Sequence, residues 1–412
     1  MSKLVVAVLI GVGCVSTSTL SAPLSDLSQG QTGRIEYTSI TPKNHYDLSH
    51  NAPSPNVTVY GTLTLPAGTT GKVPAMVVAH HCDGITDSVT NLAAMLNSIG
   101  IATFVPDSFT PRGLSSVCSI SYDAAPAVAD NLYALKLLAT HPRIDPNRIG
   151  IVGQSFGGFS VFNSAIDEVR KGVISDSLKF SAHVAMYPGC GFRYWSANMT
   201  GAPIMILMGA LDDATPGCTS YGVLLRSLGP QVTSIIYPDA YHAWDNPTPP
   251  TYKSNATNPD NCHFDQRVDQ WIASRWDTGE VFNDQTTKYN YTTSCLTNAG
   301  YWVGNNSAAK QASDTDIAIF LAKTFKMGNV VLPASQPDRI FNYLQDTYPQ
   351  YLAPAGAASQ TASGYYYRYY SNTSSYIATN GSGKVYYLSN GIGLIEIGAE
   401  AAWLNTSSQS GY

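Results

Sequence analysis

The sequence predicts an α/β fold built on a mainly parallel, doubly wound sheet. Short apolar runs such as Val73–Ala79 contain no polar residue, which is typical of strands buried on both faces. These runs alternate with helical patterns at the spacing of β-α-β units. Binding sites in such sheets form beyond the carboxyl ends of the strands. The residues that follow each predicted strand are therefore the first candidates for chemistry.

The predicted elements follow this alternation after two N-terminal strands of antiparallel type. The predicted strands are Arg34–Thr38, Val57–Leu65, Val73–Ala79, Ile101–Val105, Ile149–Val152, Ala182–Met186, Pro203–Met208 and Val232–Tyr237. The predicted helices are Leu92–Ile99, Ala125–Ala139, Phe159–Val169 and Tyr221–Leu228, with Ala308–Phe325 as the closing helix.

Length and composition predict one large domain and a smaller one. The chain has 412 residues, of which 12% are charged, and a net charge of −5. The charges are not clustered, so neither a nucleic acid nor an anionic membrane is expected as a partner. We place the large domain at residues 30–328, a linker at 329–337 and a small β-rich module at 338–412.

The N-terminus predicts export. A short basic start is followed by the apolar run Leu4–Val15 and by small residues up to Ala22. We interpret 1–22 as a signal peptide, which is too short to span a membrane. The protein is then secreted or periplasmic. Cys14 raises the alternative of a lipoprotein, but Gly11 occupies the position where a lipobox usually has Leu, so lipidation is the less favoured interpretation.

The cysteines other than Cys14 suggest disulfides. Their number is even, and in an exported protein such cysteines usually form disulfides. Fifteen pairings are possible, and pairing neighbours along the chain is the simplest. Free thiols or a metal site are less favoured because no C-x-x-C spacing occurs. The six residues are Cys82, Cys118, Cys190, Cys218, Cys262 and Cys295.

A candidate nucleophile lies between a predicted strand and a predicted helix. Gly153–Gly157 reads Gly-Gln-Ser-Phe-Gly and matches the G-x-S-x-G elbow of α/β-hydrolases. Its glycines let the strand and the helix approach closely around Ser155. The pentapeptide alone is weak evidence, since Ser155 could be an ordinary turn serine. Phe156 follows Ser155 in the turn that leads into the predicted helix, and backbone N–H groups at the start of a helix have no partner within it. Its N–H would therefore be available to an oxyanion hole.

An acid and a base follow two later strands. Asp212 and Asp213 come after Pro203–Met208, and His242 comes after Val232–Tyr237. The chain order Ser, Asp, His is that of α/β-hydrolases. A purely structural role for His242 is the competing interpretation, because the chain has seven other histidines. Asp239 and Asp245 flank His242 too closely in sequence to be the usual third member.

In these and other stretches the chain resembles the dienelactone hydrolase family. The resemblance covers roughly residues 30–250 and implies an α/β-hydrolase fold. It also implies Asp212 as the acid, because Asp212 matches the family pattern G-x-x-D-x-x-x-P, and the backbone N–H of Cys82 as the second oxyanion donor, with His81 as the next choice. The stretches are Val77–Gly84, Asp107–Gly113, Asp145–Gly150, Gly209–Pro216 and Ala240–Asp245.

The chain departs from the family pattern at two places. The namesake enzymes use a cysteine nucleophile where this chain has Ser155, so dienelactone itself is not the expected substrate. His80–His81 replaces the usual His-Gly of the oxyanion strand. A metal site at His80, His81, Cys82 and Asp83 is not expected, because adjacent residues rarely all face one ion.

Two further segments lie beyond the compact family plan. We interpret 246–304 as an insertion with a helix at Phe264–Trp276, either a lid or, slightly favoured, a surface elaboration, since loop insertions cost little. The Tyr-rich module is predicted to begin with a helix at Asp338–Tyr348. Short strands are predicted at Tyr365–Tyr370, Ser375–Ala378 and Lys384–Leu388. This module forms either an aromatic face for attachment to a cell surface or polymer, or a packed sheet without a ligand.

Together these features predict a secreted serine hydrolase that cleaves carboxylic esters through an acyl-enzyme. No cofactor or metal is expected, and the ester is a small molecule or part of a polymer. Two alternatives stay open. The hydrolase fold could be the scaffold of a non-catalytic binding or surface protein, or the enzyme could be a peptidase of the same fold.

Overall fold

The computed structural model describes residues 22–119, 122–215 and 217–327, together with the backbone of five strands between Ser359 and Ala399. The predicted signal peptide before Ala22, the linker at 329–337 and the helix at Asp338–Tyr348 lie outside the described residues.

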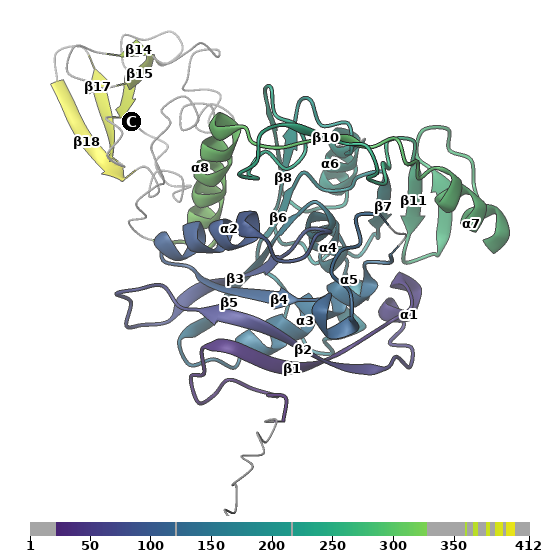
Figure 1. Cartoon of the computed structure of the whole chain (residues 1–412). Coiled ribbons are helices and arrows are strands. Elements are labelled where there is room, and N and C mark those ends of the chain that lie inside the picture. Colours follow the sequence, from purple (N-terminus) through teal and green to yellow (C-terminus); the bar gives the residue numbers. More distant parts are fainter. Residues whose placement is uncertain are drawn as a thin grey trace, which may run out of the picture.

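An eight-stranded sheet forms the centre of the molecule, in the order β1-β2-β4-β3-β5-β6-β8-β9. The first two strands pair antiparallel with each other, and β2 pairs antiparallel with β4. All other neighbours pair parallel, which confirms the predicted fold class (Figure 1). The strands are β1 (Gly33–Ile40), β2 (Asn56–Thr64), β3 (Val73–Ala79), β4 (Ala102–Asp107), β5 (Ile144–Gln154), β6 (His183–Met186), β8 (Ile204–Gly209) and β9 (Val232–Tyr237).

Both faces of the sheet are covered, because successive side chains of a strand point to opposite faces. Val77 and Val78 of β3 are both fully buried but belong to two different core clusters. One core packs against α2 and α8, and the other packs against α3, α4 and α6. The helices are α1 (His45–Ser49), α2 (Asp87–Ser98), α3 (Ala125–Leu138), α4 (Phe156–Ser164), α5 (Asp167–Lys171), α6 (Cys218–Ser227), α7 (Gln285–Ser294) and α8 (Ser307–Thr324), with a 3₁₀ turn at Thr110–Arg112.

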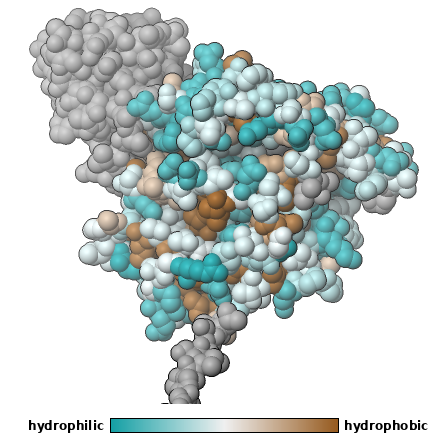
Figure 2. Space-filling model, viewed as in Figure 1, coloured by the Kyte–Doolittle hydropathy of each residue, from teal (hydrophilic) through white to brown (hydrophobic). Residues whose placement is uncertain are grey.

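The surface carries both polar and apolar side chains. Figure 2 shows one face of the molecule, on which hydrophobic side chains form small patches separated by polar ones. Within the described part of the chain, no helix combines the length and apolarity needed to cross a bilayer.

The predicted helix at Phe264–Trp276 is wrong. The segment forms two strands, β11 (Phe264–Arg267) and β12 (Ile272–Arg275), which pair antiparallel. Strand β11 also pairs parallel with β7 (Phe192–Trp195). Phe264, Gln266 and Val268 are buried at every second position, which is the strand period. The short apolar pattern was compatible with either period, and pairing with β7 decides between them.

The remaining predictions differ from the structure mainly at their ends. The predicted helix Phe159–Val169 begins earlier, directly after Ser155, and is divided into α4 and α5. The insertion contains α7 and the strand pair β10 (Thr251–Lys253) and β13 (Tyr301–Val303), none of which was predicted. Near the C-terminus, β15 (Tyr366–Tyr369), β16 (Tyr376–Thr379) and β17 (Lys384–Ser389) match predicted strands. Strands β14 (Ser359–Gln360) and β18 (Gly393–Ala399) flank them in one antiparallel sheet.

Candidate active site

Ser155 lies in a strained turn between β5 and α4. Its φ of 52° and ψ of −112° are unusual for a residue with a side chain, and such strain persists where the surroundings enforce it. Glycines make the close approach possible. A Cβ on Gly153 would lie 2.2 Å from the carbonyl oxygen of Gly157, and a Cβ on Gly157 would lie 2.1 Å from that of Ala79. The turn therefore presents the Ser155 hydroxyl at the carboxyl edge of the sheet.

The structure brings Ser155, His242 and Asp212 into one chain of hydrogen bonds. Nε2 of His242 lies 2.9 Å from Oγ of Ser155, and Nδ1 of His242 lies 2.9 Å from Oδ2 of Asp212. A carboxylate only accepts, so Nδ1 carries the proton and Nε2 accepts from the serine hydroxyl. This arrangement can move the serine proton to His242 while Asp212 stabilises the imidazolium.

Of the two adjacent carboxylates, Asp212 is the one that faces the imidazole. Its side chain is fully buried, and its Oδ1 accepts a 2.9 Å hydrogen bond from the backbone N–H of Ala214. Asp213 is exposed. The two hydrogen bonds, from Ala214 and from Nδ1 of His242, fix the position of the Asp212 carboxylate.

A second buried network lies behind His242, and the sequence reasoning missed it. The ring of Tyr187 packs edge-on against the imidazole, with centroids 4.9 Å apart. Asp245 accepts hydrogen bonds from the Tyr187 hydroxyl, at 2.6 Å, and from the side-chain amide of Gln154. Burial raises the pKa of the Asp245 carboxyl above its usual range, although both hydrogen bonds oppose this shift. One member of this network could have been singled out from the sequence, because Gln154 lies within the Gly153–Gly157 motif.

The predicted oxyanion donors both line the cavity beside Ser155. Phe156 is the first residue of α4, so its N–H is one of the donors that a helix leaves free. Cys82 lies in the loop after β3 and is bridged to Cys118. The Cys82 carbonyl accepts a 2.8 Å hydrogen bond from the N–H of Val117. The disulfide and this hydrogen bond tether the loop to the segment after β4.

The side chain of His81 is engaged elsewhere. Its Nε2 lies 2.8 Å from the hydroxyl of Thr86, and its Nδ1 accepts from the backbone N–H of Asp83. Burial lowers the pKa of His81 to about 4. Potential ligand atoms of His81, Cys82 and Asp83 lie within 4.8 Å of one another. However, the Cys82 sulfur is part of a disulfide and cannot serve as a thiolate ligand.

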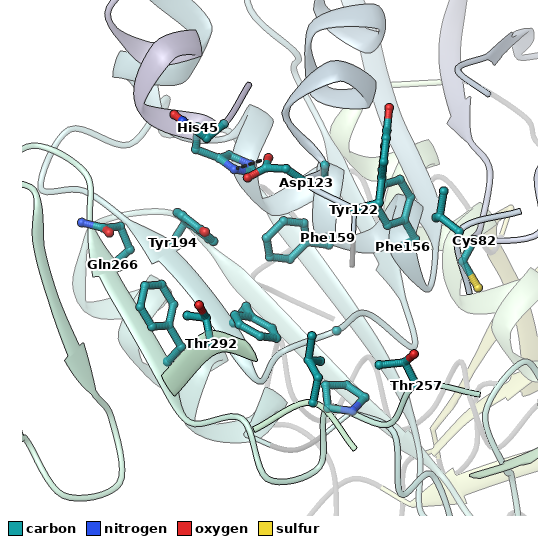
Figure 3. A pocket seen from close by; sticks show the side chains of 18 of the residues that line it. His45, Cys82, Tyr122, Asp123, Phe156, Phe159, Tyr194, Thr257, Gln266 and Thr292 are labelled. Atoms are coloured by element: carbon teal, nitrogen blue, oxygen red, sulfur yellow. Dashed lines mark ion pairs between the residues drawn. The ribbon is translucent and has the colours of Figure 1, made fainter. Parts of the chain in front are cut away.

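The candidate site opens into a cavity of about 760 Å³. Its walls come from the loops after β3 and β4, from α4, from β7 and from the insertion (Figure 3). Much of the lining is aromatic, which suits an extended and partly apolar ligand. The aromatic lining residues include Phe156, Phe159, Phe192, Tyr194, Phe264 and Tyr301.

The insertion forms one wall of this cavity. Gln266 of β11 and Lys288 and Thr292 of α7 line it together with Tyr301. This finding differs from the favoured interpretation of a surface elaboration. Two contacts bring the insertion to the cavity: β11 pairs with β7, and the Cys262–Cys295 disulfide joins the start of β11 to the end of α7. The other predicted bridges, Cys82–Cys118 and Cys190–Cys218, are also present.

A strained serine between a parallel strand and a helix, bonded to a histidine and an aspartate that follow later strands, places this protein in the α/β-hydrolase class. Within that class, the chain belongs to the dienelactone hydrolase family. The family model matches residues 59–272, which are 214 of the 412 residues.

Individual relatives are distant. The chain is 21% identical over 165 residues to a Synechocystis protein named "Putative carboxymethylenebutenolidase", and this match covers 37% of the chain and 62% of that protein. The chain thus spans less than two thirds of that relative's length. Among solved structures, a "Putative Dienelactone Hydrolase" from Klebsiella pneumoniae is 19% identical with a TM-score of 0.37, covering 51% of this chain and 88% of that one. Thermogutta terrifontis esterase 2 is 14% identical with a TM-score of 0.36, covering 46% and 80%.

Proposed function

We propose that this protein is an exported serine hydrolase that cleaves carboxylic esters through an acyl-enzyme. The observation that carries the proposal is the series of hydrogen bonds from Asp212 through His242 to Ser155. Ser155 and His242 line a cavity large enough for an organic ester. Nε2 of His242 lies within hydrogen-bond distance of the serine hydroxyl, so it can take the proton whose removal makes this hydroxyl nucleophilic.

The reaction then proceeds in two halves. Oγ of Ser155 attacks the ester carbonyl carbon while Nε2 of His242 takes the hydroxyl proton, and the collapsing tetrahedral intermediate expels the alcohol, which receives that proton. A water molecule next attacks the acyl carbon, and its proton passes to His242 and then to Oγ of Ser155. One ester and one water give one acid and one alcohol, and the enzyme is regenerated.

Two backbone N–H groups would stabilise the negative charge on the carbonyl oxygen. We assign this role to Phe156, at the start of α4, and to Cys82, in the tethered loop after β3. Each such donor is worth roughly 10²–10³ in rate. Because the Cys82–Cys118 bridge limits loop movement, this donor is held in place before the substrate arrives.

Three bridges among six cysteines support export, because such bonds persist in oxidising compartments. A lipid anchor at Cys14 and an attachment role for the Tyr-rich module stay predictions. The scaffold alternative is less favoured, since a scaffold has no need for a strained serine bonded to a histidine. A peptidase shares the same residues, so only activity separates it from an esterase.

The test uses the Ser155→Ala variant of the full chain. We expect the hydrolysis rate of p-nitrophenyl acetate to fall by at least about 10³-fold, as for other serine hydrolases that lose the nucleophile. A fluorophosphonate probe should label the wild type at Ser155. Ser227→Ala, an exposed serine of α6, is the matched control and should keep wild-type activity.

Three outcomes decide between the alternatives. An active Ser155→Ala protein would refute the mechanism. A wild type that is neither labelled nor active on any ester would favour the scaffold function. Faster cleavage of peptide p-nitroanilides than of matched p-nitrophenyl esters would favour a peptidase.

A further inference from the structure

Besides Asn44, three threonines and several tyrosines, four polar residues line the same cavity as Ser155 but take no part in the proposed reaction. They are His45 of α1, Asp123 before α3, Gln266 of β11 and Lys288 of α7. In Figure 3 His45 and Asp123 point toward one another, and Gln266 lies on the opposite side of the cavity from Cys82. The cavity therefore has a polar end, built from segments far apart in the sequence.

His45 holds a buried nitrogen that lacks a partner. Its side chain is 3% exposed, and its Nδ1 lies 3.1 Å from Oδ1 of Asp123. In a neutral ring the nearby carboxylate favours the proton on Nδ1, because a carboxylate only accepts, and Nε2 is then an acceptor. Neither ring nitrogen has a well-aligned hydrogen bond among the described residues: Nδ1 lies near the Asp123 carboxylate, and Nε2 has no polar partner there. A buried polar atom without a partner calls for an explanation, and a ligand group that donates to it is one.

The imidazole is also held firmly in its orientation. It stacks on the ring of Tyr194, with centroids 4.5 Å apart, and meets the ring of Phe159 edge-on at 5.7 Å. Asp123 is itself fixed by a 2.8 Å hydrogen bond from the N–H of Ala125. The acceptor at Nε2 is thus preorganised, as a recognition site requires.

Lys288 brings donors to the same end. Its ammonium donates a 2.6 Å hydrogen bond to Oε1 of Gln266 and lies 5.5 Å from the ring centroid of Phe264. An ammonium has three N–H groups, so two remain for a ligand. No carboxylate of the described chain lies within ion-pair distance of it. Burial lowers the pKa of Lys288, and the nearby charge of Asp123 opposes this shift.

The chemistry of these groups selects a neutral hydroxyl. A carboxylate at this end would face the negative charge of Asp123, and an ammonium would face Lys288. A hydroxyl can donate to an imidazole nitrogen and accept from an ammonium at once. The walls beside it are the rings of Tyr194, Phe159 and Phe264, which favour an aromatic ring as the neighbouring part of the ligand.

We propose that this end of the cavity recognises a hydroxylated aromatic ring carried by the ester. The ring lies among the aromatic walls, its hydroxyl donates to Nε2 of His45, and Lys288 donates to an oxygen on the same ring. This inference deepens the proposed function and rests on it where it names the ring as part of the hydrolysed ester.

The first test compares ester pairs that differ by one hydroxyl. On the acid side, methyl 3-(4-hydroxyphenyl)propanoate is compared with methyl 3-phenylpropanoate, and on the alcohol side 2-(4-hydroxyphenyl)ethyl acetate is compared with 2-phenylethyl acetate. We expect the hydroxylated ester of at least one pair to have a kcat/KM about 10-fold higher or more, because a site built for a hydroxyl rejects the analogue without it.

Variants locate the source of this preference. His45→Phe keeps an aromatic ring but removes Nε2, and Lys288→Met keeps the stem but removes the ammonium. Each should bring the kcat/KM ratio of the pair toward 1. Lys253→Met removes an exposed positive charge of the insertion and should leave the ratio unchanged. If one variant does not fold, the other and the wild-type ratio still decide.

A binding measurement separates this inference from the proposed function. Calorimetry of the Ser155→Ala variant with the same esters should show about 10-fold tighter binding of the hydroxylated member of one pair. If the wild type cleaves no ester but this preference persists, the proposed function fails and the recognition site stands. If esters are cleaved but neither kcat/KM nor binding distinguishes the members of either pair, the recognition site is refuted.

Discussion

The hydroxyl of Tyr187 donates a 2.6 Å hydrogen bond to the buried carboxylate of Asp245. The same tyrosine meets the imidazole of His242 edge-on, and Asp245 also accepts from Gln154, the residue before Ser155. The network therefore connects Gln154 of the elbow to the imidazole of His242. Gln154, Tyr187 and Asp245 do not line the cavity, and none of them transfers a proton in the proposed reaction.

Tyr187→Phe should destabilise the fold, because the buried Asp245 charge loses one of its donors. Hydrogen bonds to charged groups contribute about 1.5–3 kcal/mol, so we expect a loss of that order in the free energy of unfolding, measured by urea denaturation. Tyr289→Phe, whose side chain is 67% exposed, is the matched control and should change stability by less than about 0.5 kcal/mol. Equal losses in the two variants would contradict the prediction.

Asp245→Asn should change how stability depends on pH. Burial raises the pKa of Asp245 in the folded protein above its usual value near 3.8. Between these two pKa values the folded state holds a proton that the unfolded state has lost, so this group's contribution to stability falls as pH rises. An amide does not titrate. The variant should thus gain stability relative to the wild type as pH rises above 3.8, until the pH passes the raised pKa of folded Asp245.

Urea unfolding of both proteins at a series of pH values provides the measurement. Other titrating groups are common to both proteins and cancel in the difference. The new amide can be accommodated, since Oε1 of Gln154 is buried without a hydrogen-bond partner and can accept from it after a flip of the Gln154 amide. A stability difference that stays constant across the pH range would show that Asp245 keeps an ordinary pKa.

Gly157→Ala should disrupt the elbow. The added Cβ would lie 2.1 Å from the backbone oxygen of Ala79, and backbone cannot yield as a flexible side chain does. We expect a loss of at least about 3 kcal/mol in the free energy of unfolding, at the upper end of overpacking effects. Gly71→Ala, where no atom lies within 4 Å of the new Cβ, is the matched control. A stable Gly157→Ala protein with wild-type activity would be inconsistent with this elbow.

Replacing both Cys262 and Cys295 by Ala should weaken the insertion wall. The bridge closes a loop with a sequence separation of 33, and chain-entropy arguments predict a stabilisation of about 2–4 kcal/mol. Because α7 contributes to the wall, KM for a bulky aromatic ester should rise more than KM for p-nitrophenyl acetate. The double variant of Cys190 and Cys218, with a similar separation of 28, is the comparison. An unchanged KM for both esters would argue against a role of this bridge in the wall.

Local pattern was sufficient for the fold class and for the three residues of the hydrogen-bonded chain. Buried strands read as continuous apolar runs such as Val73–Ala79, and Ser155, Asp212 and His242 each follow a strand of a parallel sheet. In such a sheet the carboxyl ends of all strands meet at one edge. Position along the chain therefore implied position in space for these residues.

The insertion shows where local pattern is insufficient. Phe264, Gln266 and Val268 are buried because β11 pairs with β7, more than 70 residues earlier in the chain. That pairing partner is not encoded in the segment itself. A helix and a strand were both compatible with the same short run of apolar residues, and the tertiary contact chose the strand.

The sequence by itself determined the order of strands and helices, the elbow and the residues that follow the parallel strands. The strands and helices depend on local periodicity, and the carboxyl ends of parallel strands meet at one edge of the sheet. Only the tertiary structure decided which side chains surround the serine. His45 and Lys288 lie 110 and 133 residues from Ser155 in sequence and yet line its cavity. Contacts of this kind depend on how the loops pack against one another, and the spacing of residues along the chain does not reveal this packing.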